Sequence, residues 1–208
     1  MRKVAIVGWR GMVGSVLMER LRQEDDFKNF SASFFSTSQV GQAGPKIDGT
    51  VYELKDGKNA KLLAEADIIL TCQGGDYTQE MHPQLRQMGW QGYWIDAAST
   101  LRMNEDAVIV LDPVNRRVID AALKAGVKDY IGGNCTVSLM LMALGGLFQK
   151  GWVEWISSQT YQAASGAGAK NMRELIVQMA AIAGASADLL ANPATNILEL
   201  DRQVISAM

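Results

Sequence analysis

A strand-like run, a glycine-rich turn and an amphipathic helix follow one another at the start of the chain. Lys3–Val7 is continuously apolar and rich in β-branched residues, as in a strand buried within a parallel sheet. The turn reads Gly8-Trp-Arg-Gly-Met-Val-Gly14, and Met12–Arg22 then gathers apolar residues on one helical face. Such a turn lets backbone N–H groups approach a phosphate at a helix start, which predicts a dinucleotide site. Its G-x-x-G-x-x-G spacing also leaves open a turn that only connects strand to helix.

Strand-like and helix-like segments continue to alternate over the next hundred residues. The further strands are predicted at Ser33–Ser36, Ala66–Cys72, Tyr93–Asp96, Ala107–Leu111 and Lys128–Ile131. A helix is predicted over Thr78–Met88, and a second is expected to begin at Asp112-Pro113, with Asp112 as its N-cap. Residues 39–59 are turn-rich and give no clear prediction. This alternation predicts an α/β fold with a Rossmann-like, doubly wound parallel sheet, whose ligands bind at the carboxyl ends of the strands.

The pattern changes after Phe148. Trp152–Ala163 alternates apolar and polar residues, which predicts an antiparallel strand. A loop of small residues, a long helix from about Asn171 and an amphipathic stretch, Thr195–Met208, follow it. We expect a dinucleotide-binding domain over residues 1–133, and over 134–208 the beginning of an incomplete α+β catalytic and dimerisation domain.

Composition narrows the class of protein. The chain is 48% hydrophobic and 20% charged with a net charge of −2, so nothing attracts it broadly to nucleic acid or to an anionic membrane surface. No apolar run has the length of a membrane helix, and the first strand leaves no room for a signal peptide. Cys72 and Cys135 lie too far apart to suggest a disulfide framework or a metal cluster. We expect a cytoplasmic, reduced protein without a metal.

A cysteine lies where a loop of small residues meets a helix-like segment. Gly132-Gly-Asn-Cys-Thr136 runs into the apolar stretch Val137–Phe148. The N–H groups and dipole of a helix start favour the thiolate, so Cys135 is a candidate nucleophile, and Asn134 could orient a substrate or polarise its carbonyl group. The alternative for Cys135 is a small buried hydrophobe, which is the interpretation we prefer for Cys72.

The end of the second predicted strand bears on the choice of dinucleotide. NAD-binding folds place an acidic residue there for the ribose 2′-hydroxyl, whereas this chain has Ser36-Thr37-Ser38. Hydroxyl groups without a carboxylate suit a 2′-phosphate, so Thr37 and Ser38 favour NADP. A plain serine- and threonine-rich turn remains an alternative, and the acidic residues 24–26 are near enough in sequence to keep NAD open.

Other polar residues have a functional and a plain interpretation. Arg102 follows a predicted strand and could hold an anion in its planar fork, or it could be a solvated arginine. Gln162 and the loop Ser165–Ala169 could approach a cofactor or only join two elements. His82 is expected on a helix surface. No Tyr-x-x-x-Lys, H-E-x-x-H, Walker A or G-x-S-x-G pattern occurs, which disfavours short-chain reductases, metalloproteases, NTPases and serine hydrolases.

Taken together, these residues closely resemble the bacterial aspartate-β-semialdehyde dehydrogenases, from Val4 to about Met208. The most specific stretches are Gly8–Ser15, Phe34–Ser38, Thr71–Tyr77, Trp94–Ala98, Gly133–Met140 and Thr160–Gly166. The resemblance implies NADPH-dependent reduction of L-aspartyl 4-phosphate to L-aspartate 4-semialdehyde through a Cys135 thioester. That reaction belongs to lysine, threonine, methionine and diaminopimelate biosynthesis.

The same resemblance implies a role for each matching residue. Arg102 would bind the phosphate, and Gln162 would contact the substrate. The residues that would hold NADP are Gly8, Arg10, Gly11, Met12, Val13, Thr37, Ser38, Gln73, Ser165, Gly166 and Pro193. The family is homodimeric, with its interface largely in the catalytic domain.

One departure from the family concerns its acid–base group. The family's catalytic histidine, and its substrate-binding arginine and glutamate, correspond to positions after Met208, and His82 does not match that histidine. We therefore expect the 208-residue chain to bind NADPH weakly and to turn over little or not at all. The alternatives are a non-catalytic NADP-binding fragment and an enzyme like N-acetyl-glutamyl-phosphate reductase.

Overall fold

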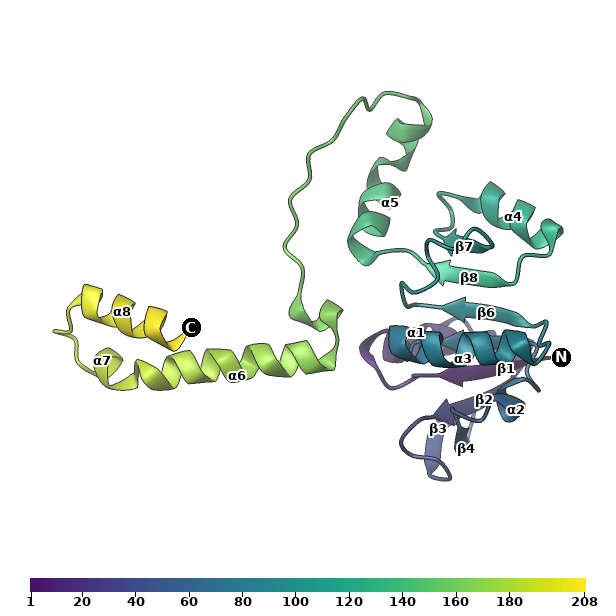
Figure 1. Cartoon of the computed structure of the whole chain (residues 1–208), viewed down its shortest axis with the longest axis horizontal. Helices are drawn as coiled ribbons and strands as arrows, with labels where there is room; N and C mark the ends of the chain where they lie inside the picture. Colours follow the sequence, from purple (N-terminus) through teal and green to yellow (C-terminus); the bar gives the residue numbers. More distant parts are fainter. The chain divides into compact units, whose positions relative to one another are not determined.

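Eight strands form one sheet in the order β3-β4-β2-β1-β5-β6-β8-β7 (Figure 1). In the computed structural model, which describes residues 1–208, this sheet lies in the first of two compact units, Met1–Ser158, and the second unit is Gln159–Met208. Neighbouring strands are parallel except for β3 and β4, which form an antiparallel hairpin. The predicted α/β class with a doubly wound, mostly parallel sheet is confirmed. The predicted domain boundary at residue 133 stays a prediction.

The strands have the following bounds. They are β1 Arg2–Val7, β2 Phe30–Ser36, β3 Ala43–Ile47, β4 Thr50–Asp56, β5 Ile68–Thr71, β6 Tyr93–Asp96, β7 Ala107–Val110 and β8 Asp129–Gly132. The α-helices of the first unit are α1 Met12–Gln23, α2 Ala60–Leu63, α3 Gly75–Gln87, α4 Arg116–Ala125 and α5 Cys135–Gln149, and a 3-10 turn, η1, spans Asp26–Asn29. No helix of either unit is both long enough and apolar enough to cross a bilayer.

Two apolar cores lie on the two faces of the sheet. Along β1, Ala5 and Val7 point into one core with α2 and α3, whereas Val4 and Ile6 point into the other with α1 and the hairpin. This division follows from the two-residue period of a strand, which sends successive side chains to opposite faces. Because both faces are covered, β1 reads as a continuous apolar run and not as an alternating one.

The sheet order reverses direction beside β1, and this positions the site. β2 pairs with one edge of β1, and β5, the next strand beyond the hairpin and α2, pairs with its other edge. The connections after β1 and β5 therefore leave the sheet in opposite directions. A crevice opens between them at the carboxyl ends of the strands, where ligands of doubly wound sheets bind.

Three features differ from the sequence-based expectations. The turn-rich region contains the β3–β4 hairpin, which was not predicted because β3 includes Gly44 and Pro45. These residues usually mark turns, but an edge strand tolerates proline because one row of its N–H groups has no partner.

The predicted start of the fourth helix is wrong by three residues. α4 begins at Arg116, with Asn115 as its N-cap. The Asn115 side chain closes the turn after β7, because its Oδ1 accepts from Leu111 N at 2.9 Å and its Nδ2 donates to Ile109 O at 2.7 Å. Asp112 and Pro113 therefore lie in this turn and not in the helix.

The predicted strand over Trp152–Ala163 is also wrong. These residues have no regular secondary structure, and residues 153–162 make no backbone–backbone hydrogen bond. An alternating pattern specifies a strand only where a neighbouring strand satisfies its backbone groups, and this segment has no such neighbour in the structure.

The second unit is helical. The 3-10 turn η2 spans Ala164–Ala167, and three α-helices follow it, α6 Ala169–Ala185, α7 Ala187–Ala191 and α8 Ile197–Ala207. α8 folds back beside α6 (Figure 1), and Gln203 Nε2 donates to Ala185 O at 3.4 Å. The predicted long helix and the amphipathic C-terminal stretch correspond to α6 and α8.

Candidate functional site

The glycine turn joins β1 to α1 with almost no free space. Gly8 has a φ of +77°, which glycine adopts readily, and a Cβ there would lie 2.6 Å from the backbone of Cys72 and Gln73. A Cβ on Gly14 would lie 2.2 Å from Gly8 O. The turn, the first part of α1 and the end of β5 therefore pack backbone against backbone. Gly11 is the N-cap of α1 and offers no side-chain cap.

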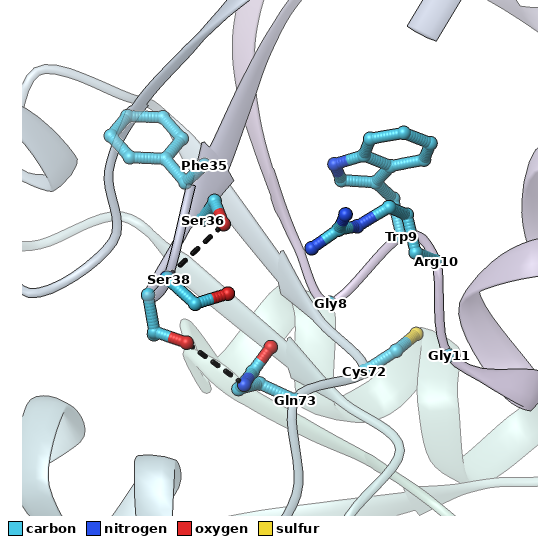
Figure 2. Close-up of a pocket in the computed structure, with 10 residues that line it drawn as sticks. Gly8, Trp9, Arg10, Gly11, Phe35, Ser36, Ser38, Cys72 and Gln73 are labelled. Carbon is cyan, nitrogen blue, oxygen red and sulfur yellow. Dashed lines mark hydrogen bonds between the residues drawn. The ribbon is translucent and has the colours of Figure 1, made fainter. Parts of the chain in front are cut away.

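A cleft of about 370 Å³ opens between this turn and the ends of β2 and β5. Figure 2 shows the Arg10 side chain reaching from the turn toward Ser36 and Ser38, with the Trp9 ring beside it. The residues that line the cleft are Gly8, Trp9, Arg10, Gly11, Phe35, Ser36, Thr37, Ser38, Cys72 and Gln73. Six of the predicted cofactor residues are thus brought together. Met12 and Val13 follow on the first turn of α1 but do not line this cleft.

Hydrogen bonds organise the segment after β2. Ser36 Oγ accepts from the backbone N–H groups of Ser38 and Gln39 at 3.3 and 3.1 Å. The Thr37 hydroxyl accepts from Gln73 Nε2 at 3.2 Å, which connects the ends of β2 and β5 across the cleft. The Arg10 guanidinium lies 5.6 Å from the Trp9 ring and also donates to Gln39.

No carboxylate lines this cleft. The acidic residues that kept NAD open lie beyond the opposite end of α1, where Glu24 pairs with Arg20 at 2.9 Å and Asp25 pairs with Lys28 at 2.8 Å. Arg10 is the only charged residue among those that line the cleft. An anionic group suits this end of the cleft better than a neutral diol.

Cys135 is the first residue of α5 and is exposed. The preceding Asn134 is the N-cap, and its Oδ1 accepts from Val137 N at 3.0 Å. Because the Asn134 oxygen is used in this way, its amide nitrogen is the atom left for a substrate. The Cys135 thiol lies 3.9 Å from Thr136 Oγ1.

Arg102 is half-buried and reaches the loop before Cys135. Its Nε donates to Gly132 O at 2.8 Å, and its Nη2 donates to Gly133 O at 3.1 Å. Of the five N–H groups of a guanidinium, three remain for other partners. The interpretation of Arg102 as a solvated arginine is therefore wrong, because its side chain is held against residues 132–134, the loop before Cys135 that we call the cysteine loop.

The remaining predicted cofactor and substrate residues belong to the second unit. Gln162 lies just before η2, which contains Ser165 and Gly166, and Pro193 lies between α7 and α8. The Gln162 amide packs over Gly166, because a Cβ there would lie 2.8 Å from Gln162 Nε2. Gln162 and Gly166 are therefore in contact within their own unit.

His82 is not on a helix surface, and this prediction is wrong. Its side chain is 12% exposed, packs edge-on against Trp94 with ring centroids 5.3 Å apart, and places Nε2 3.0 Å from Asp129 Oδ2 without the alignment of a hydrogen bond. The sequence did not indicate this burial, because His82 precedes a proline within α3 and most of its neighbours in the sequence are exposed. His82 lies in α3 beside the first residue of β8, whereas Cys135 follows the opposite end of that strand.

Four residues of the cleft were not predicted as ligands, namely Trp9, Phe35, Ser36 and Cys72. The feature of the sequence that could have identified them is their position, since each lies at or near the end of a predicted strand. Cys72 is half-buried, and burial, aided by Asp96, raises the pKa of its thiol to about 11. It is therefore a wall of the cleft and a poor nucleophile.

Two family models match the chain. Residues 3–122 match the one described as "Semialdehyde dehydrogenase, NAD binding domain", and residues 144–205 match "Semialdehyde dehydrogenase, dimerisation domain". Together they cover the cleft residues in the first unit and most of the second unit.

Solved structures give the same relationship. The chain is similar to aspartate semialdehyde dehydrogenase from Francisella tularensis, with 48% identity, a TM-score of 0.89, and coverage of 99% of this chain and 55% of that one. It is also similar to aspartate semialdehyde dehydrogenase II from Vibrio cholerae, complexed with ASA, with 25% identity, a TM-score of 0.72, and coverage of 88% and 53%. A third similar structure, from Candida albicans with NADP, has 18% identity, a TM-score of 0.50 and coverage of 72% and 47%, and its likeness concerns the fold alone. The chain spans about half the length of these proteins.

Proposed function

The chain belongs to the semialdehyde dehydrogenase family, and from this premise we propose that it acts as an aspartate semialdehyde dehydrogenase that uses NADPH. The 48% identity with the Francisella tularensis protein supports this substrate class, as does the Vibrio cholerae relative complexed with ASA. The activity of the whole protein is part of the proposal, because the chain spans about half of those relatives.

The observation that carries the proposal is the cleft between the glycine turn and the end of β2. Glycine at the N-cap, Gly11, leaves the start of α1 without a side-chain cap, so its first N–H groups would hold the pyrophosphate. Thr37, Ser38 and Arg10 would hold the 2′-phosphate, since the cleft has hydroxyl groups and a cation but no carboxylate. Gln73 would contact the middle of the cofactor. When bound, NADPH supplies the hydride for the reduction.

The protein's own chemistry would centre on Cys135. Its thiolate would attack the carbonyl carbon of aspartyl 4-phosphate. A C–S bond then forms, the bond between the carbonyl carbon and the bridging phosphate oxygen breaks, and inorganic phosphate leaves. The Asn134 amide nitrogen would orient the carbonyl group, Arg102 would bind the phosphate through its free N–H groups, and Gln162 would contact the substrate.

The pathway and the assembly follow from the same proposal. The product would enter the biosynthesis of lysine, threonine, methionine and diaminopimelate. Residues 144–205, which match the dimerisation domain, would contribute to a homodimer.

One experiment with two measurements tests this function. Fluorescence titration of the purified chain should give tighter binding of NADPH than of NADH. Arg10→Gln with Thr37→Val should weaken NADPH binding about tenfold or more, the effect of losing charge-assisted hydrogen bonds, and should leave NADH binding nearly unchanged. Equal affinities for the two nucleotides would contradict the assignment of the 2′-phosphate site.

The second measurement is turnover with phosphate, NADP⁺ and aspartate semialdehyde. It should be made on the chain alone and on the chain mixed with a second polypeptide that corresponds to the rest of the Francisella tularensis enzyme. Any turnover should disappear in Cys135→Ala, which should still bind NADPH. Comparison of aspartyl phosphate with N-acetyl-glutamyl phosphate in the reverse direction separates the two related enzymes, and a preference for the latter would overturn the aspartate assignment.

A further inference from the structure

A buried carboxylate at the end of β6 has three hydrogen-bond donors and no cationic partner. Asp96 Oδ2 accepts from Thr78 Oγ1 at 2.6 Å and from Trp94 Nε1 at 3.3 Å, and its Oδ1 accepts from Ala98 N at 2.8 Å. Burial of a charge is costly unless hydrogen bonds compensate for it, and here all three donors come from α3, β6 and the loop after β6. The carboxylate therefore fastens the start of this loop to α3.

The same loop, residues 97–102, is fastened to α3 a second time. Thr100 Oγ1 donates to Gly75 O at 3.3 Å, at the first residue of α3, and Arg102 N donates to Ser99 O at 3.0 Å in a tight turn. Leu101, between them, is buried in the core. The Arg102 side chain thus extends from a loop that is held in place at its start, middle and end.

Arg102 connects this fixed loop to the cysteine loop by two hydrogen bonds. Nε and Nη2 lie on the same edge of a guanidinium, and in this structure that edge donates to two consecutive carbonyl oxygens, those of Gly132 and Gly133. The residues that follow are Asn134, the N-cap, and Cys135, the first residue of α5. The end of the guanidinium formed by Nη1 and the second Nη2 hydrogen remains free for an oxyanion.

We infer that Asp96 and Arg102 are positioning residues for Cys135: Asp96 fixes the loop that carries Arg102, and the inner edge of Arg102 holds the thiol at the start of α5. The inference rests on the proposed role of Cys135 as the nucleophile. It gives Arg102 two functions at once, because one edge of its guanidinium holds the nucleophile's loop while the other remains available to the phosphate that the nucleophile displaces. Lysine cannot replace it, since an ammonium group is a point donor without a planar fork.

The test is the rate at which iodoacetamide alkylates Cys135, followed by mass spectrometry between pH 6 and 9. Cys72 interferes little, because burial raises its pKa to about 11. Arg102→Lys should slow alkylation at pH 7 about two- to fivefold, the size of a helix terminus acting on an adjacent anion, and should move the pH midpoint of the reaction upward. Arg117→Lys, an exposed arginine on α4, is the matched control and should change neither quantity.

A double-mutant cycle tests the link between the two residues. Asp96→Asn should also slow alkylation, and the double variant with Arg102→Lys should be no slower than Arg102→Lys alone, because both act through one loop. If Asp96→Asn fails to fold, Thr78→Val replaces it, since it removes one donor to the carboxylate and keeps the shape of the side chain. An unchanged pH midpoint in folded Arg102→Lys, or fully additive effects, would overturn the inference.

These results are independent of the proposed cofactor site. Arg102 and Asp96 do not line the cofactor cleft, so their variants should bind NADPH like the wild type. A wild-type chain that binds no NADPH would refute the proposed function and leave the alkylation result standing. Normal NADPH binding with unaltered alkylation would refute only the positioning role.

Discussion

Gly8 and Gly14 differ from most glycines in the chain because backbone atoms occupy the space of a side chain. At Gly14 a Cβ would lie 2.2 Å from Gly8 O and 2.7 Å from Trp9 Cα, so Gly14→Ala forces the turn and α1 apart. We expect it to destabilise the fold by about 1–3 kcal/mol, as for other overpacking changes, and to weaken NADPH binding. Thermal unfolding and nucleotide titration measure both effects.

Gly11→Ala is the matched control for this residue-scale prediction. A Cβ on Gly11 has Gly8 O as its nearest neighbour at 3.6 Å, and its backbone has φ −67° and ψ 172°, which alanine adopts without strain. Its unfolding temperature should stay near that of the wild type. Equal destabilisation by the two substitutions would show that loss of glycine flexibility, and not close packing, makes the turn sensitive.

Sequence patterns predicted individual site residues where a strand end and a residue type coincided. Arg10, Thr37 and Gln73 were expected in one site, and they line one cleft. The sequence offered a serine- and threonine-rich turn after the second strand, and Ser36 Oγ organises that turn through contacts two and three residues along the chain. The pattern did not reveal that Arg102 holds the cysteine loop. That contact depends on β6 and β8 being neighbours in the sheet, which a local pattern does not contain.

At the scale of elements, two side chains of α3 contact Asp129, the first residue of β8, and fasten α3 to that strand. Asp129 Oδ1 accepts from Arg86, and His82 Nε2 lies 3.0 Å from Oδ2. Burial alone would raise the pKa of Asp129, but His82 and Arg86 more than offset this and hold the pKa below its ordinary value of 3.8. The folded state therefore binds the proton less tightly than the unfolded state does.

This depressed pKa gives a stability prediction with a definite sign. The stabilisation by Asp129 is present above pH 3.8 and is lost as the pH falls through the folded-state pKa. Asp129→Asn should lower the free energy of unfolding by about 2–4 kcal/mol at pH 7, since it removes the carboxylate that pairs with Arg86. The difference in unfolding free energy between variant and wild type should narrow in acid. Asp120→Asn, an exposed ion-pair partner of Arg116, should have almost no effect. Urea unfolding at several pH values checks this, and a difference that stays constant down to pH 2.5 would contradict it.

Elements were predicted well where periodicity was strong and poorly where pairing decided the outcome. β6, at Tyr93–Asp96, matched its predicted bounds because three consecutive strand-forming residues, Tyr93–Ile95, fix it locally. The β3–β4 hairpin contains glycine and proline and exists because β4 pairs with β2. Conversely, Trp152–Ala163 has a strand pattern but no strand to pair with.

At the scale of the whole molecule, this unpaired segment spans the boundary between the two compact units, Met1–Ser158 and Gln159–Met208. Every residue that lines the cofactor cleft lies in residues 8–73, whereas η2 and α6 follow the segment. Trp155 and Tyr161 within it are 78% and 103% exposed, and its backbone makes no regular hydrogen bonds. Exposed backbone without hydrogen bonds enters protease active sites readily.

We therefore expect brief chymotrypsin treatment to cut first at Trp155 or Tyr161. Aromatic residues inside the sheet, such as Trp94, are buried and should resist cleavage. The N-terminal fragment should still bind NADPH, because the cleft is formed within it, and a lower affinity than that of the intact chain would measure the contribution of Ser165, Gly166 and Pro193. Mass spectrometry of the fragments and titration of the purified N-terminal part check both statements. First cleavage within the sheet, or slow cleavage at Trp155 and Tyr161, would show that this segment is covered in solution. The next measurement would then be the oligomeric state, because residues 144–205 match a dimerisation domain.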